Sequence, residues 1–123
     1  MNLFITGAAK GIGAATARLF VNKGWFVGLG DVDEKGLQQM EEELGAENVC
    51  CCVMDVTDVE SVRKAFEKFA EHTGGKMDTL LNNAGILYAG PFDEISLEQH
   101  KRLIDINFFG VVNCAHQAIP YLE

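Results

Sequence analysis

A glycine-rich turn near the start of the chain limits what it can fold into more than any other feature. The apolar run Leu3–Thr6 predicts a β-strand, and Thr6-Gly7-Ala8-Ala9-Lys10-Gly11-Ile12-Gly13 leads from it into a predicted helix that ends near Lys23-Gly24. In this order, strand, turn and helix N-terminus form a site for anions, because free backbone N–H groups point at the ligand. A glycine-rich turn alone can be no more than a turn, but its place between strand and helix favours a pyrophosphate site.

The residues of this turn have separate expected roles. Gly7 makes the tight turn, Gly11 lets the backbone approach a pyrophosphate, and Gly13 permits close packing of the helix on the strand. Ile12 stands between the two glycines at the helix start. Lys10 is a cation that can neutralise phosphate, with a solvated surface lysine as the alternative. A P-loop is excluded, because neither Gly-Lys-Ser nor Gly-Lys-Thr occurs in the chain.

Apolar runs alternate with amphipathic stretches along the rest of the chain, a pattern typical of βαβ units and a parallel sheet. Further strands are predicted at Trp25–Leu29, Val49–Met54 and Met77–Leu81. Helices are predicted over Leu37–Leu44 with Gly45 as its end, over Val59–Ala70 with Gly74-Gly75 as its end, and from Leu97 almost to the end of the chain. The expected capping boxes are Thr57 with Glu60 and Ser96 with Gln99. The chain, residues 1–123, is therefore expected to form one α/β domain.

Carboxylates follow the second and third predicted strands. Asp31 lies about 20 residues beyond the glycine turn, where an acidic residue holds the ribose 2′-hydroxyl of NAD and repels the 2′-phosphate of NADP. The alternative role of Asp31 is to cap the next helix, for which Asp33 is a competent rival. Asp55 lies at the carboxyl edge of the sheet, where doubly wound folds bind their ligands. Because Thr57 is expected to cap the following helix, we expect the Asp55 carboxylate to face a ligand.

Together with two further motifs, these residues resemble the short-chain dehydrogenase/reductase family. Its pattern T-G-x-x-x-G-x-G is matched by Thr6–Gly13, and its Asp after the third strand by Asp55-Val56. Its N-N-A-G motif is matched by Asn82-Asn83-Ala84-Gly85, and its Asn in the following long helix by Asn107. The resemblance spans the chain from the first motif to the last, in the family's order.

The resemblance implies a fold and a set of site residues. The fold is a Rossmann-type, doubly wound parallel sheet in the order 3-2-1-4, here truncated, which binds NAD(P). Asp55-Val56 would meet the adenine. Asn82-Asn83-Ala84-Gly85 would tie neighbouring strands together and line the cofactor site, with Asn83 the preferred contact and a purely structural role equally open for Asn82. Asn107, expected to be buried and to need partners, would join the catalytic group through a proton relay.

The family's remaining chemistry needs a Ser and a Tyr-x-x-x-Lys motif, which the family carries on elements after the long helix. These 123 residues do not contain them, since the chain ends with that helix and neither Tyr88 nor Tyr121 fits the motif. The resemblance thus covers the N-terminal half of the family fold. It implies a complete enzyme that transfers a hydride between NAD, rather than NADP, and an alcohol or ketone, and we expect the 123-residue chain alone to be inactive. The alternative is a non-catalytic dinucleotide-binding or assembly module.

The acidic balance of the chain argues against nucleic acid as a partner. Its formal net charge is −8 and its pI is near 4.8, so a phosphate backbone would be repelled. No apolar run reaches the roughly 20 residues that a membrane span needs, and no secretory signal precedes Leu3. With four cysteines that suit a reducing compartment, we expect a cytoplasmic protein with no membrane partner.

The cysteines and histidines do not indicate a metal site. Cys50-Cys51-Cys52 lie in an apolar run and are interpreted as packing residues rather than redox or metal-binding residues. Cys114 has no Cys-x-x-Cys partner. His72, His100 and His116 share no ligand spacing, so we expect no bound metal.

The last predicted helix indicates self-association. It carries more apolar side chains than one sheet contact needs: Ile104, Phe108, Val111, Val112, Ala115 and Ile119. In the short-chain dehydrogenase/reductase family, which the sequence resembles, this helix lies at a subunit interface. The fourth predicted strand would also leave a free edge in a 3-2-1-4 sheet. We therefore expect a homo-oligomer.

Overall fold

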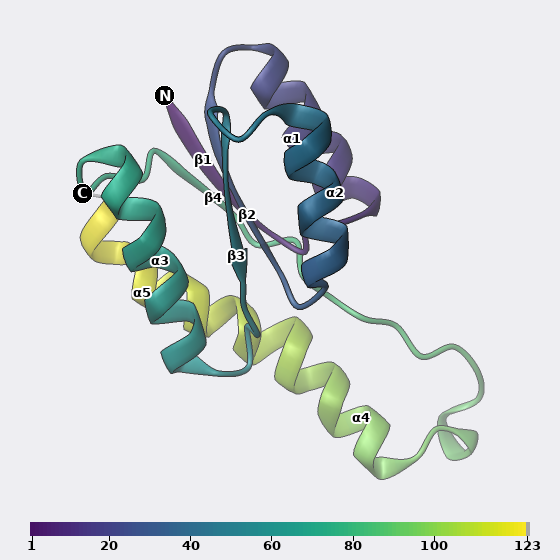
Figure 1. Ribbon diagram of the computed structural model, residues 1–123. Helices are drawn as coiled ribbons and strands as arrows, with labels where there is room; N and C mark the ends of the chain where they lie inside the picture. The colour runs from purple at the N-terminus through teal and green to yellow at the C-terminus, as the bar shows by residue number, and fades with distance from the viewer. Residues whose placement is uncertain (123) are drawn as a thin grey trace.

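Four parallel strands form the sheet, in the order β3-β2-β1-β4 (Figure 1). The computed structural model describes residues 1–122, and Glu123, the last residue of the expected domain, lies outside the described residues. The strands are β1 (Asn2–Thr6), β2 (Phe26–Asp31), β3 (Val49–Val53) and β4 (Thr79–Leu81). The predicted order 3-2-1-4 of a Rossmann-type α/β fold is confirmed.

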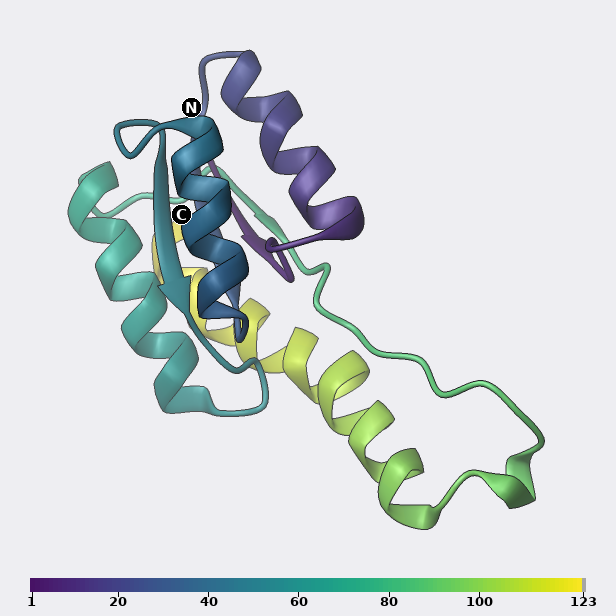
Figure 2. The same ribbon diagram turned by 45° about the vertical axis from the view of Figure 1, so that its right-hand side comes forward.

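Helices cover both faces of this sheet. On one face lie α1 (Gly11–Asn22) and α2 (Glu34–Leu44), and on the other lie α3 (Val59–Thr73) and α5 (Gly110–Leu122), as Figures 1 and 2 show. Apolar side chains cover both faces of the strands, which is why the strands read as continuous apolar runs rather than as alternating ones.

Side-chain alternation along β1 divides the interior into two cores. Leu3 and Ile5 pack under α1 and α2, while Phe4 packs under α3 and α5. The rings of Phe66 and Phe69 on α3 meet the Phe4 ring edge-on, with centroid distances of 4.9 and 5.3 Å. The neighbouring strand makes room for these rings, since a Cβ at Gly28 would lie 2.4 Å from a Phe4 ring carbon.

Strand β4 is shorter than the predicted Met77–Leu81, because its first two residues are bonded elsewhere. The Met77 N–H donates to the Tyr121 carbonyl at the end of α5, at 2.8 Å. Asp78 exchanges two hydrogen bonds with Asn2: its carboxylate accepts from the Asn2 N–H, and its own N–H donates to the Asn2 side chain, both at 2.8 Å. The ladder with β1 therefore begins at Thr79.

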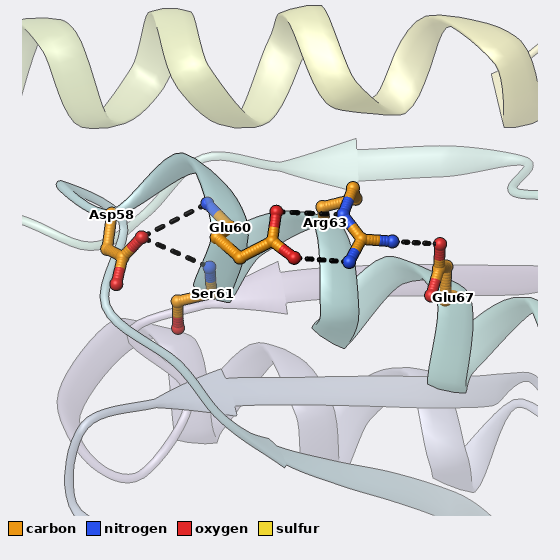
Figure 3. A network of polar contacts seen from close by, with 5 residues as sticks. All are labelled: Asp58, Glu60, Ser61, Arg63 and Glu67. Carbon is orange, nitrogen blue, oxygen red and sulfur yellow. Dashed lines mark hydrogen bonds and ion pairs between the residues drawn. The ribbon is translucent and has the colours of Figure 1, made fainter.

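The prediction that Thr57 caps α3 is wrong. The cap is Asp58, whose Oδ1 accepts from the N–H groups of Glu60 and Ser61 at 3.1 and 3.3 Å (Figure 3). The Glu60 side chain does not bond back to the cap but pairs with Arg63, which also pairs with Glu67 (Figure 3). The second predicted capping box, Ser96 with Gln99 at the start of α4 (Leu97–Ile104), is confirmed.

The last predicted helix is not continuous. It consists of α4, a π-helical turn (η2, Asp105–Phe109) and α5. Figures 1 and 2 both show α4 and the segment before it, which contains the short turn η1 (Phe92–Glu94), projecting from the sheet at one end. Among residues 1–122, no helix has both the length and the apolar character that crossing a membrane requires.

Candidate functional site

A cavity of about 460 Å³ opens at the carboxyl ends of the strands. Its wall is built by the glycine turn, the ends of β2 and β3, the segment after β4, and α4 with the turn that follows it. Predicted site residues on this wall are Gly7, Lys10, Gly11, Asp31, Asp55, Val56, Asn83, Ala84 and Gly85. Predicted site residues that do not line it are Ile12, Gly13, Asn82 and Asn107.

The glycine turn is shaped by backbone conformations and contacts that side chains would prevent. Gly7 and Gly11 have φ values of +69° and +60°, in the left-handed region that glycine adopts without strain. A Cβ on Gly13 would lie 2.1 Å from the Gly7 carbonyl oxygen, so only glycine fits there. A Cβ on Gly11 would meet nothing within 4 Å, so the cavity side of that residue is open. Helix α1 begins directly after Lys10, with its N-terminus at the cavity.

Asp31 joins the end of β2 to the glycine turn. Its Oδ2 accepts from the Ala9 N–H and its Oδ1 accepts from the Asp33 N–H, both at 3.0 Å. The helix-capping role belongs to Asp33, whose carboxylate accepts from the Gly36 N–H at 3.0 Å. Each carboxylate oxygen has more than one acceptor position, so both oxygens of Asp31 keep capacity for a ligand hydroxyl.

Asp55 is held differently from the sequence expectation. Its Oδ1 accepts from both the N–H and the hydroxyl of Thr57, at 2.9 and 2.7 Å. Thr57 thus orients Asp55 instead of capping α3, and Oδ2 is the oxygen available to a ligand. The adjacent Val56 is buried, and its carbonyl accepts from the Asn113 side chain on α5 at 2.9 Å.

The segment after β4 is tied to the end of β1 by the buried hydroxyl of Thr6. Its Oγ1 accepts from the N–H groups of Asn83 and Ala84, both at 3.0 Å. The Asn83 side chain also donates to the Gly7 carbonyl at 3.1 Å. These bonds place Ala84 and Gly85 beside the glycine turn. Thr6 belongs to the glycine-turn motif in the sequence, but the motif alone does not predict this role of its hydroxyl.

Asn107 lies in the π-helical turn and is exposed, not buried as expected. Its side-chain amide bonds to the backbone of Ile86 on both sides, accepting from the N–H at 2.9 Å and donating to the carbonyl at 2.8 Å. This pairing fixes the turn against the segment that follows Gly85. Asn107 therefore borders the cavity without lining it.

Further residues line the cavity that the sequence does not predict as site residues: Gly30, Val32, Asp33, Met54, Ile86, Arg102 and Ile106. Most are neighbours of predicted residues in the chain. Arg102 and Ile106 come from α4 and the π-helical turn, and their i, i+4 spacing is the only sequence signal that places them on one face. Because Lys10 and Arg102 share the wall with Asp31, Asp33 and Asp55, it carries charges of both signs.

The cysteines lie away from this cavity. Cys50 and Cys52 are buried in the core beneath α3, with sulfurs 3.8 Å apart, and all four cysteines are free. Burial raises the pKa of the Cys114 thiol to about 12, and burial with the nearby Glu41 raises that of Cys51 to about 11. Within residues 1–122, no group of three or more His, Cys, Asp or Glu side chains is placed to hold a metal ion.

The chain is similar to known dehydrogenases and reductases. The family model described as short chain dehydrogenase matches residues 2–123. Meso-2,3-butanediol dehydrogenase of Serratia marcescens is 36% identical over 118 residues, which are 96% of this chain and 47% of that protein. L-fucose dehydrogenase of Oryctolagus cuniculus is 38% identical over 121 residues, covering 97% of this chain and 41% of that protein. The chain spans about half the length of the curated relatives it matches.

Solved structures show the same relationship. A short-chain dehydrogenase/reductase from Brucella melitensis has a TM-score of 0.94 and 35% identity, with 99% of this chain and 52% of that one covered. A 3-ketoacyl-(acyl-carrier-protein) reductase from the same organism, complexed with NADH, has a TM-score of 0.91 and 29% identity, with 98% and 49% covered.

Proposed function

Because the chain belongs to the short-chain dehydrogenase family, we propose that its cavity binds NAD and that the whole protein transfers a hydride between NAD(H) and an alcohol or ketone. The observation that carries the cofactor assignment is the Asp31 carboxylate, which is fixed on the cavity wall by the N–H groups of Ala9 and Asp33. A carboxylate held in this way is preorganised to accept hydrogen bonds from ribose hydroxyls.

The rest of the wall fits a dinucleotide. Gly11 leaves the space that a pyrophosphate needs, and the N-terminus of α1 supplies N–H groups and a positive dipole end. Lys10 adds a cation at the same place. At the far end of the wall, Asp55 and Val56 offer a carboxylate oxygen and an apolar surface for the adenine. The nicotinamide ring, when bound, supplies or accepts the hydride.

The choice of NAD over NADP rests on charge. A 2′-phosphate would bring about two negative charges toward the carboxylate of Asp31, and the repulsion disfavours NADP. Lys10 acts in the opposite direction, since a cation favours a 2′-phosphate, but it stands within the glycine turn, where we assign it to the pyrophosphate. We therefore assign NAD as the cofactor.

Catalysis requires groups beyond those in this chain. We place Asn107 in a proton relay of the complete site, as the family resemblance implies, with its amide orientation set by Ile86. The Ser and the Tyr-x-x-x-Lys motif of the family are absent from these 123 residues, so a polypeptide limited to them should bind the cofactor without turnover. A non-catalytic dinucleotide-binding module is the second candidate, because the residues of the cavity wall need none of those groups to hold a dinucleotide.

Calorimetric titration of the purified protein with NAD and NADP tests the cofactor assignment. We expect NAD to bind more tightly, and tighter binding of NADP would refute the role of Asp31. Steady-state NADH formation across a panel of secondary alcohols tests the chemistry. Production of NADH by the 123-residue polypeptide would overturn its proposed inactivity, and failure of the full-length protein to react with any alcohol or ketone would favour the binding module.

Two wider properties of the protein belong to the same proposal. We propose a homo-oligomer that buries the exposed apolar side chains of the last helical region, among them Phe108, Val112 and Ile119. Light scattering at tens of micromolar tests this, with a stable monomer as the contrary result. We also propose a cytoplasmic location, because the four free cysteines suit a reducing compartment.

A further inference from the structure

We propose that Arg102 closes the adenine end of the cofactor cavity by stacking its guanidinium group on the base. The proposal rests on the NAD site proposed above and adds to it a residue outside the motifs that identify the family. Arg102 lies in the last turn of α4, is exposed, and lines the cavity together with Asp55, Val56 and Ile106.

The helix holds Arg102 on this side of the cavity. Ile106 follows four residues later, so the two side chains project from one face of the helical segment. Ile106 is buried in the core cluster that also contains Val56, which fixes the rotation of that face toward the cavity. The pairing of Asn107 with Ile86 then locks the segment against the wall.

The two cations on the wall lie on opposite sides of the sheet edge. Lys10 directly precedes α1, which covers one face of the sheet together with α2. Arg102 belongs to the segment that continues into α5, which covers the other face with α3 (Figures 1 and 2). The glycine turn and its phosphate site adjoin Lys10, whereas Arg102 adjoins the Val56 side of the cavity. This division assigns Lys10 to the pyrophosphate and Arg102 to the adenine.

The chemistry of the side chain suits this position. Guanidinium is planar and weakly hydrated, so it stacks on aromatic faces while its edge stays hydrogen-bonded. Within residues 1–122, the ion pairs formed by arginines are those of Arg18 and Arg63, which leaves the Arg102 group free to turn onto a ligand. The carboxylates on the same wall, such as Asp55, can accept from the guanidinium edge once the base is in place.

Binding of adenosine, AMP and nicotinamide mononucleotide to the purified protein tests the proposal. Arg102→Ala should weaken the binding of adenosine and of AMP by the same factor, ~3- to 30-fold, as expected for the loss of one stacked cation. Arg102→Lys keeps the charge but not the planar group, so it should weaken the binding of adenosine and of AMP nearly as much. Nicotinamide mononucleotide, which lacks adenine, should bind all forms equally.

Lys101→Ala is the matched control, because Lys101 is a neighbouring cation that shares with Arg102 a second hollow beside α4 but does not line the cofactor cavity. It should leave adenosine and AMP binding unchanged. Since Arg102 is exposed, all variants should unfold at the wild-type urea midpoint.

Three results would overturn the proposal. A loss confined to AMP would show that Arg102 pairs with phosphate, and equal binding by wild type and Arg102→Ala would show that it does not contact the nucleotide. If the wild type bound none of NAD, AMP and adenosine, the cofactor assignment itself would be wrong, and so would the role proposed for Arg102. The wild-type titration therefore separates failure of the site from failure of this residue.

Discussion

The side-chain amide of Asn107 forms hydrogen bonds with both backbone polar groups of Ile86, at 2.9 Å from the Ile86 N–H and 2.8 Å to its carbonyl. The two residues are far apart in the chain, and their pairing connects the π-helical turn to the segment after β4. Asn107→Ala leaves both backbone groups without this partner, so the free energy of unfolding should fall by about 1–3 kcal/mol. Urea denaturation measures the loss. Asn22→Ala, at the exposed end of α1, is the control and should change stability by less than about 0.5 kcal/mol. Equal effects of the two substitutions would contradict the structural role of the pairing.

Asp31 should control both the affinity and the choice of cofactor. Asp31→Ala removes an acceptor for the ribose and the charge that repels a 2′-phosphate, so NAD binding should weaken by about 1.5–3 kcal/mol while NADP binding strengthens relative to it. Asp31→Asn keeps one acceptor oxygen and should retain more of the NAD affinity. Calorimetry with both dinucleotides gives the ratio. An unchanged NAD-to-NADP ratio in both variants would show that this carboxylate only supports the turn through Ala9 and Asp33.

The two glycines of the turn should respond to substitution for different reasons. Gly13→Ala places a Cβ 2.1 Å from the Gly7 carbonyl, so the turn must shift, at a cost of about 1–3 kcal/mol or more and with loss of nucleotide binding. Gly11 has open space around it and a φ of +60°, a conformation that asparagine tolerates. Gly11→Asn should therefore stay within about 1 kcal/mol of the wild-type stability. Equal destabilisation by both changes would argue against a steric limit at Gly13.

The start of α3 offers a direct comparison of two adjacent capping candidates. Asp58→Ala removes the acceptor for the N–H groups of Glu60 and Ser61 and should lower the free energy of unfolding by about 1 kcal/mol. Thr57→Ala removes only the hydroxyl bond to Asp55 and should cost less than about 0.5 kcal/mol. Thermal melts of both variants rank them. The reverse ranking would restore Thr57 as the cap.

Buried thiols should make the fold less stable at alkaline pH. An unfolded cysteine ionises near pH 8.5, whereas the folded thiols of Cys51 and Cys114 have pKa values of about 11 and about 12. Above about pH 8.5 the unfolded state therefore loses protons that the folded state keeps, and stability falls as the pH rises toward the folded values. Urea midpoints between pH 8 and pH 11 should decline, and less steeply in Cys114→Ala than in the wild type. Identical slopes would show that Cys114 ionises as readily in the fold as outside it.

The fold could be predicted from the sequence because its determinants are local. Apolar runs of strand length, glycines at helix ends and the turn from Thr6 to Gly13 specify each βαβ unit without knowledge of the others. The capping error shows the limit of such patterns. Thr57 and Asp58 are adjacent and both are good N-caps, and the spacing of Glu60 fits a return partner for Thr57 although its side chain pairs with Arg63 one turn later.

The site was predictable only as far as its motifs reach. The spacing between the glycine turn and Asp31 identifies both in the sequence, but the contribution of Arg102 depends on where a helix distant in the chain meets the cavity. That meeting is set by the π-helical turn, which shifts the helical register at Asp105–Phe109 and has no periodic signature in the sequence. The local bond from Thr57 to Asp55 was likewise hidden, because a threonine after an aspartate fits a cap as well as an Asx-type turn.

The buried hydroxyl of Thr6 joins two parts of the cavity wall. Because one buried oxygen accepts from both Asn83 and Ala84, the end of β1 and the segment after β4 cannot separate without breaking two bonds at once. This part of the cavity wall is therefore assembled without a ligand, and binding of the proposed nucleotide would not have to order it. Slow amide exchange at Asn83 and Ala84 in the ligand-free protein is the signature of such a wall, and nucleotide binding should change it little.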